Sequence, residues 1–248
     1  MPSALNRWVA FGLSILVAPG CTPGCPEPTV RQEDARQSAK PGINDAYRVK
    51  DLDVEEWSDR FEVESREIFA HRHAIVAAAG FQAGATIADI GAGTGLFTML
   101  FAEATGPQGR LYAVDIVPKF LEHIDARTRK TGVSNVTTVL CKDDSVELPR
   151  GSIDAAFICD AYHHFEYPNC TMRSLHRAMK LGSTLIVIDF ERIEGVSRDW
   201  ILGHVRAGKD RVIEEITSNG FALMGDAEIP GLEENYFLRF AKTTRATK

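Results

Sequence analysis

Nine residues decide the fold of this chain: Ile87-Ala88-Asp89-Ile90-Gly91-Ala92-Gly93-Thr94-Gly95. They join the pattern of a buried strand to a glycine-rich turn, with an acid just before the turn. Glycine lacks a Cβ, so the chain can turn with positive φ and let backbone amides approach a ligand closely, while the next helix begins directly beneath. The stretch predicts a small-molecule cofactor site, although a tight strand-to-helix turn needs glycine even without a ligand.

The spacing of these glycines argues against a nicotinamide cofactor. A dinucleotide-binding fingerprint has the form G-x-G-x-x-G, whereas Leu96 stands here in the place of the third glycine. The stretch instead resembles motif I of class I S-adenosylmethionine-dependent methyltransferases with a type 11/25-like domain. The resemblance implies S-adenosylmethionine as the cofactor, with its methionine end held by Asp89, Gly91, Ala92, Gly93 and Gly95.

A second buried strand, Leu111-Tyr112-Ala113-Val114-Asp115, ends in another carboxylate at the edge where parallel sheets bind ligands. In the family that the chain resembles, the matching acid holds the ribose, which assigns this role to Asp115 and places Ile116 against the adenine. The alternative is that Asp115 only ends a strand or caps the helix that begins near Pro118.

Further along the chain, strand-like runs alternate with helical periodicity. We expect strands at 86–90, 111–114, 136–140, 153–159 and 184–190, and a last pair at 221–224 and 236–240 joined through Pro230-Gly231. This alternation predicts an α/β fold with helices on both faces of a mostly parallel sheet. The resemblance implies the doubly wound, Rossmann-like, seven-stranded sheet of class I methyltransferases, with an antiparallel C-terminal strand.

Polar residues follow the third and fourth strands. In the resembling family an acid after the third strand binds the adenine amino group, and the spacing to Leu148-Pro149 favours Asp144 over Asp143. The run Asp160-Ala161-Tyr162-His163-His164 follows the fourth strand, and its paired histidines resemble the segment that precedes the family's substrate face. Histidine titrates near neutrality, so His163 or His164 is a candidate general base, with Asp160 beside them, although cofactor contact or structural hydrogen bonding is an open alternative.

Two other segments are candidates for the acceptor side. Residues 54–80 have helical periodicity, and in the resembling family such helices fold over the cofactor, which makes Trp57, Phe61 and Arg66 candidate lid residues. The link after the fifth strand carries four cations: Arg192, Arg198, Arg206 and Lys209. They could bind a carboxylate or phosphate of the acceptor. The alternative is that they lie on a solvated helix face.

Composition narrows the partners. With 248 residues, 44% of them hydrophobic, the chain can form one sizeable core, and its net charge of -6 gives no overall attraction to nucleic acid. We therefore expect a small-molecule substrate. The cysteines show no metal-binding spacing, so we expect no metal, and Cys141 and Cys159 are expected to pack. A nicotinamide-dependent oxidoreductase and a binding module without turnover remain the alternatives.

The N-terminus predicts separate segments. Residues 1–21 have the layout of a signal peptide or lipoprotein box, with Cys21 as the candidate site of lipid attachment, and 22–46 have the composition of a disordered tether. The methyltransferase domain is expected over 47–248, with a cofactor half at about 80–190 and substrate-side elements at 47–79 and 191–235. The chain would lie in the cell envelope if this signal functions, and in the cytoplasm otherwise.

Overall fold

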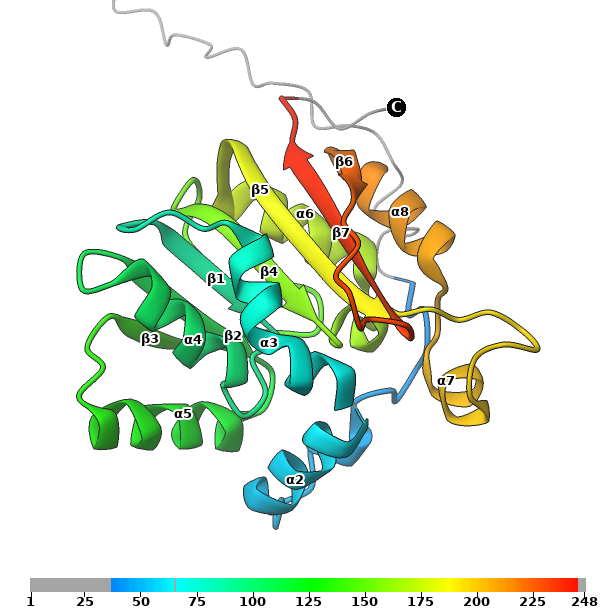
Figure 1. The fold of residues 1–248 in the computed structure, drawn as a ribbon, viewed down its shortest axis with the longest axis horizontal. Coiled ribbons are helices and arrows are strands. Elements are labelled where there is room, and N and C mark those ends of the chain that lie inside the picture. The colour runs from blue at the N-terminus through cyan, green and yellow to red at the C-terminus, as the bar shows by residue number, and fades with distance from the viewer. Residues whose placement is uncertain (1–36, 65, 245–248) are drawn as a thin grey trace, which may run out of the picture.

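The computed structural model describes residues 37–64 and 66–244, and the predicted signal segment with Cys21 lies outside this range. Seven strands form one sheet in the order β3-β2-β1-β4-β5-β7-β6 (Figure 1). The strands are β1 (Thr86–Ile90), β2 (Arg110–Asp115), β3 (Val136–Leu140), β4 (Ile153–Cys159), β5 (Met179–Phe190), β6 (Phe221–Asp226) and β7 (Asn235–Lys242).

Strand direction confirms the predicted fold class. The pairs β2–β3, β1–β2, β1–β4 and β4–β5 are parallel, whereas β7 is antiparallel to both β5 and β6. The central strands are apolar on both faces, as expected where helices cover both sides of a sheet. The sheet is that of the class I methyltransferase fold.

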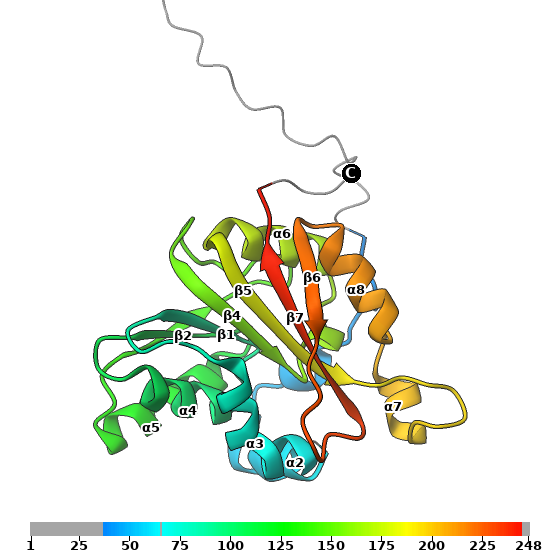
Figure 2. The ribbon, with the colours of Figure 1, turned by 45° about the horizontal axis from the view of Figure 1, so that its top comes forward.

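Helices cover both faces of the sheet (Figures 1 and 2). Side chains of α3 (Arg66–Ala79), α4 (Leu96–Thr105) and α5 (Pro118–Thr131) pack on one face, and those of α6 (Pro168–Ala178) and α8 (Lys209–Thr217) pack on the other. The remaining elements are η1 (Asp45–Tyr47), α2 (Val54–Glu64), η2 (Tyr162–His164) and α7 (Asp199–His204), which lie toward the carboxyl edge of the sheet.

Several element boundaries differ from the sequence predictions. The helical pattern over 54–80 forms two helices, α2 and α3, rather than one, and Gly80 ends the second with a φ of 66°. Between β5 and β6 the chain forms two helices: the short helix α7, which ends before Val205 in an extended conformation, and α8, which begins at Lys209. Strand β5 begins at Met179, earlier than predicted, since Met179 pairs with Ile153 of β4.

The described N-terminal segment packs on the domain before the predicted boundary at residue 47. Asn44 is buried and donates from Nδ2 to the backbone oxygen of His164 at 3.1 Å. The Nζ of Lys40 donates to the backbone oxygen of His204 at 2.9 Å, at the end of α7. We call residues 38–48 the N-terminal strap; Figure 1 shows it in blue beside α7. The ordered domain thus extends further toward the N-terminus than composition indicated, because a few polar side chains anchor the strap.

Two other features of the described residues bear on the predictions. Across residues 37–244 we find no helix that is long and apolar enough to cross a membrane. Cys141 and Cys159 are half-buried and pack against the core on opposite faces of the sheet. Burial raises the pKa of the Cys141 thiol to about 12 and that of the Cys159 thiol well above its usual value, so both behave as small apolar side chains.

Candidate active site

A cavity of about 530 Å³ opens at the carboxyl ends of β1, β2, β4 and β5. Its volume is that of a site for a small molecule. Nine of the predicted site residues line it: Asp89, Gly91, Ala92, Gly93, Asp115, Ile116, Asp160, His163 and His164. Strand order places the ends of β2 and β1 at one side of this edge and those of β4 and β5 at the other. We call these sides the carboxylate end and the histidine end.

The glycine turn after β1 packs closely against neighbouring segments of the protein. Gly91 has a φ of 73°, and a Cβ there would stand 2.5 Å from the Cβ of Ala161. Gly93 lines the cavity with a φ of 52°. Gly95 is not among the lining residues, and a Cβ there would stand 2.7 Å from Cγ1 of Ile124 on α5. Gly95 therefore permits helix packing, whereas Gly93 faces the ligand space.

Asp115 is buried at the end of β2 and is held in place by the backbone. Its Oδ2 accepts from the backbone N–H of Gly93 at 2.8 Å, and its Oδ1 accepts from that of Val117 at 2.9 Å. Burial raises the pKa of Asp115 to about 6, although these hydrogen bonds oppose the shift. A carboxylate can accept about four hydrogen bonds, so Asp115 retains capacity for the hydroxyls of a ligand.

Asp89 ends β1 beside it and is also buried. Its Oδ2 accepts from Oγ1 of Thr98 on α4 at 2.6 Å. Burial raises the pKa of Asp89 to about 7, the Thr98 hydrogen bond lowers it, and the charge of Asp115 raises it further. Asp89 and Asp115 are two buried carboxylates at neighbouring strand ends. Such a pair favours a ligand that brings positive charge and hydroxyl groups.

The loop after β3 presents two neighbouring acids. Asp143 lines the cavity and forms an ion pair with Arg48 of the N-terminal strap. Asp144 is half-buried and is not among the lining residues. The structure therefore brings Asp143, rather than the favoured Asp144, to the cavity, and the assignment of the adenine amino group to Asp144 stays a prediction.

At the histidine end, His163 is buried and held by Asp189 of β5. The distance from Nδ1 of His163 to Oδ1 of Asp189 is 2.7 Å, and the backbone N–H of His163 donates to Oδ2 at 2.9 Å. Asp189 is itself 1% exposed, so the pair is removed from solvent. Such a carboxylate fixes both the ring orientation and the Nδ1–H tautomer, which leaves Nε2 as the free ring nitrogen.

His164 adjoins it on η2 and contacts two other elements. Its Nε2 lies 3.3 Å from the hydroxyl of Tyr47 and 3.3 Å from Nε2 of His204, at the end of α7. The indole of Trp200 stacks on His204 at 5.1 Å between ring centroids. Burial lowers the pKa of His164 well below its usual value and that of His204 to about 4, and the neighbouring His163 adds to both shifts.

Asp160 stands between the two ends, where β4 runs into η2. It has a φ of 47°, a conformation that few residues other than glycine adopt. Its Oδ1 accepts from Nδ2 of Asn235 at 2.8 Å, which ties the turn to the start of β7. Asp160 lines the cavity, so its backbone strain lies at the wall of the candidate site.

Aromatic residues cover the cavity from the N-terminal side. Tyr47, Trp57, Phe61 and Phe120 form one cluster, in which the rings of Tyr47 and Trp57 lie 4.6 Å apart. Phe61 lines the cavity as the lid prediction expects, Trp57 supports it from behind, and the side chain of Arg66 lies outside the described residues.

The four cations predicted as acceptor ligands have partners within the protein. Arg206 is buried against Glu215, and Lys209 pairs with Glu191 and Asp226. Arg192 donates to backbone oxygens of α7, and Arg198 pairs with Glu234. None of the four is among the cavity-lining residues, so they fix the link between β5 and α8 instead.

Comparison with known proteins identifies the family. A family model described as a methyltransferase domain matches residues 81–236. The chain belongs to this methyltransferase family. With the fold and the paired carboxylates, this membership makes S-adenosylmethionine the cofactor and disfavours the nicotinamide alternative.

Curated relatives are methyltransferases as well. The ubiquinone/menaquinone biosynthesis C-methyltransferases UbiE of Pasteurella multocida and Burkholderia vietnamiensis are 28% and 26% identical to the chain over 114 and 118 residues. These matches cover 46% and 48% of this chain and 42% and 48% of those proteins, so the chain spans less than half the length of the curated relatives it matches.

Solved structures share the fold. A SAM-dependent methyltransferase from Aquifex aeolicus superposes with a TM-score of 0.67 at 19% identity, covering 77% of this chain and all of that one. The [4+2]-cyclase SpnF superposes with a TM-score of 0.61 at 16% identity, covering 71% and 82%. Because a cyclase has this fold, the fold alone does not determine the reaction.

Sequence reasoning missed three residues at the histidine end. The sequence pattern places Tyr47 at the start of the domain and gives it no role in the site. Trp200 and His204 lie in the link after β5, where the neighbouring arginines are the more conspicuous candidates. The sequence did contain one signal for this pair: Trp200 precedes His204 by four positions, a spacing that places both on one face of a helix.

Proposed function

We propose that the chain transfers the methyl group of S-adenosylmethionine to a small acceptor that binds at the histidine end of the cavity. The observation that carries the proposal is the division of one cavity into two chemically different ends. The carboxylate end has buried Asp89 and Asp115, and the histidine end has His163, His164 and His204 surrounded by aromatic rings.

The carboxylate end has the groups that the cofactor requires. The cofactor supplies a methyl group on a positively charged sulfur. Asp115 accepts the ribose hydroxyls, Ile116 packs against the adenine, and Asp89 with the Gly91–Gly93 turn holds the methionine end. One loop acid accepts from the adenine amino group: Asp144 by the sequence assignment, with Asp143 at the cavity wall. Separate Asp143→Asn and Asp144→Asn variants distinguish the two by their affinity for S-adenosylhomocysteine.

The histidine end aligns the acceptor. Methyl transfer is an in-line displacement, so the protein mainly positions the nucleophile, excludes water and accommodates its proton. His163 and His164 face this space, and Asp160 lies where the two ends meet. Four aromatic residues line the cavity at this end: Tyr47, Phe165, Phe190 and Trp200. They favour an acceptor with an apolar or aromatic body. None of the four cations in the link after β5 lines the cavity, so none of them is placed to receive a phosphate or carboxylate of the acceptor.

Two measurements test this function. Mass spectrometry of the natively purified protein should detect a co-purified adenosyl nucleoside. Incubation with methyl-labelled S-adenosylmethionine and an unfractionated cell extract should then transfer label to one or a few small compounds. With the cofactor below saturation, Asp115→Ala should abolish most of this transfer, whereas Asp125→Asn, on α5 and away from the cavity wall, should preserve it. Label recovered in protein or nucleic acid instead would refute a small-molecule acceptor.

We propose separately, from the sequence of residues 1–21 alone, that the chain is exported and receives lipid at Cys21. Wild-type protein should then fractionate with membranes, and Cys21→Ala should release it from them. Recovery of both forms in the cytoplasmic fraction would refute the proposal.

A further inference from the structure

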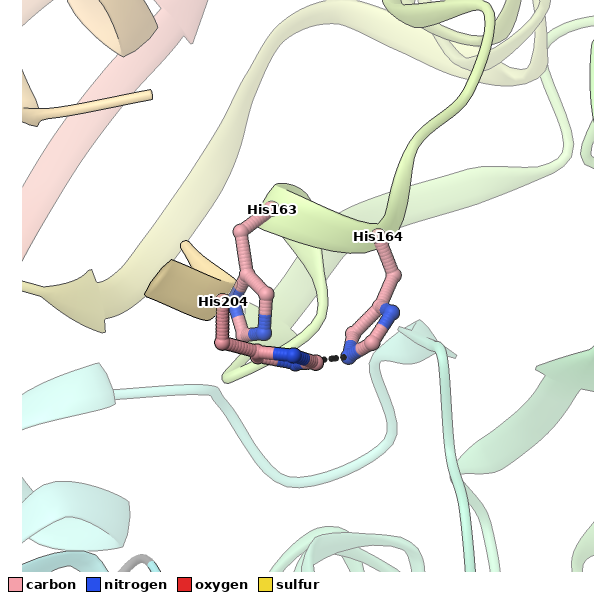
Figure 3. Close-up of side chains that lie close together, drawn as sticks. All are labelled: His163, His164 and His204. Carbon is pink, nitrogen blue, oxygen red and sulfur yellow. Dashed lines mark hydrogen bonds between the residues drawn. The ribbon is translucent and has the colours of Figure 1, made fainter. Parts of the chain in front are cut away.

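Three of the seven histidines of the chain converge at one point of the cavity, from two separate elements. Figure 3 shows His163 and His164 on η2 turned toward His204, which comes from the end of α7. One ring nitrogen from each lies within 4.8 Å of the other two. His163 is buried, the other two are half-buried, and all three line the cavity.

The spacing of these nitrogens suits a tetrahedral metal ion. Nε2 of His164 and Nε2 of His204 lie 3.3 Å apart. Two imidazole nitrogens that each stand 2.0–2.1 Å from a tetrahedral zinc ion are separated by about 3.3–3.4 Å. The third ring, that of His163, has a nitrogen within 4.8 Å of both. Three histidines on a tetrahedral ion leave one position open, as catalytic zinc sites do.

The surroundings of the three rings also resemble those of a metal site. Asp189 binds Nδ1 of His163 at 2.7 Å, which is the carboxylate–histidine arrangement that orients metal ligands. Lys40 donates to the last carbonyls of α7 and so fixes the residue that carries the third ring. Trp200 stacks on that ring.

A purely structural role accounts less well for the cluster. Nε2 of His164 and Nε2 of His204, at 3.3 Å, can share only one hydrogen, and this distance is longer than that of most hydrogen bonds to nitrogen. Three imidazoles at a cavity wall bring little packing advantage over apolar side chains, because burying their polar atoms costs free energy unless each is bonded. A cation would bond the nitrogens that face one another.

We propose that His163, His164 and His204 bind a divalent transition metal ion, with Zn²⁺ as the expected occupant, and that its open position faces the acceptor. The proposal rests on the methyltransferase function and deepens it by naming the acceptor class: a small molecule with a thiol or an acidic hydroxyl. Coordination lets that group lose its proton to solvent. Its lone pair then forms the bond to the methyl carbon, the carbon–sulfur bond breaks with its electron pair on sulfur, and the ion keeps its charge.

The first test is a titration of the full, tag-free chain after treatment with a chelator. We expect one equivalent of Zn²⁺ to bind by calorimetry, and Co²⁺ to give the visible absorption of a tetrahedral site. His204→Ala should weaken Zn²⁺ binding by more than about 100-fold, and Asp189→Asn by about 10–100-fold. His73→Ala, exposed on α3, is the matched control and should bind Zn²⁺ as the wild type does.

Two more measurements separate the histidine cluster from the N-terminal cysteines and from the cofactor site. The variant Cys21→Ser/Cys25→Ser should bind Zn²⁺ as tightly as the wild type, because these thiols are not ligands. S-adenosylhomocysteine should bind His204→Ala with wild-type affinity. Equal Zn²⁺ affinity of wild type and His204→Ala, or loss of binding in the cysteine variant, would overturn the metal proposal. Normal Zn²⁺ binding without S-adenosylhomocysteine binding would overturn the methyltransferase function, on which the acceptor role of the metal depends.

Discussion

The two ends of the cavity are built in different ways. The carboxylate end comes from two short segments, 89–95 and 115–117, each of which joins one strand to the helix that follows it. The histidine end combines the N-terminal strap, η2, β5 and α7. One hydrogen bond there, from Lys40 to His204, joins residues that are 164 positions apart in the sequence. The cofactor end is therefore encoded locally, whereas the acceptor end exists only after the chain has folded. Cofactor binding and acceptor binding should consequently respond to different substitutions.

The largest expected effect is at the turn that joins the two ends. Gly91→Ala places a Cβ 2.5 Å from that of Ala161, at a φ of 73°, and should lower the free energy of unfolding by roughly 3 kcal/mol or more. Gly132→Ala has the same φ with no atom within 4 Å, and should cost only about 1 kcal/mol. Urea denaturation measures both. Equal losses would show that backbone strain alone, and not contact between the two ends, requires Gly91.

Substitution of Asp115 should affect the cofactor end alone. Asp115→Ala removes hydrogen bonds to a charged acceptor, worth about 1.5–3 kcal/mol, and should weaken S-adenosylhomocysteine binding by roughly 10- to 100-fold. Asp115→Asn should give a smaller loss, because the amide oxygen can still accept. Calorimetry with each variant and with Asp125→Asn as the control measures this. Unchanged affinity in Asp115→Ala would refute the ribose assignment.

Cofactor affinity should also depend on pH through Asp89. Its pKa is raised to about 7 in the protein without ligand, so the carboxyl is mostly protonated at pH 5.5 and ionised at pH 8. The ammonium group of S-adenosylhomocysteine favours the ionised form, and affinity should rise about tenfold or more over this range. Asp89→Asn should flatten the rise. A wild-type profile that falls with pH would contradict the assignment.

The same group should affect the stability of the ligand-free protein in the opposite direction. A carboxyl whose pKa is higher in the folded than in the unfolded state contributes stability that is present below about pH 4 and lost as the pH rises through about 7. Asp89→Asn has no proton to lose. It should therefore unfold at a higher temperature than the wild type at pH 8, and the difference should shrink at pH 5. A destabilised variant at pH 8 would show that the Thr98 hydrogen bond outweighs the burial of charge.

The smallest effect on the cofactor is expected from the acceptor end. Tyr47→Phe removes a hydroxyl that contacts Nε2 of His164 at 3.3 Å, and should change stability by only about 0.5–1.5 kcal/mol. S-adenosylhomocysteine affinity should stay within about twofold, while methyl transfer to the acceptor falls. Loss of cofactor affinity in this variant would show that the two ends are not independent.

The same contrast explains what could be predicted from sequence. The strand positions follow from hydrophobic runs, which are patterns within a few residues. The glycine turn is equally local, and it carries the family resemblance that implies the antiparallel last strand and the roles proposed for Asp89 and Asp115. His204 could not be paired with His164 from sequence, because 40 residues and a separate short helix lie between them. The ordered strap was missed for a similar reason: its composition is polar, and side-chain hydrogen bonds such as that of Asn44 hold it in place.

A crystal structure of the chain with S-adenosylhomocysteine tests the central claim most directly. We predict the ribose hydroxyls within hydrogen-bond distance of Asp115, the amino group of the homocysteine near Asp89, and the sulfur directed toward the space between Asp160 and His164. A nucleoside bound in the reverse direction, with its adenine among the histidines, or an empty cavity at saturating ligand, would contradict the assignment of the two ends.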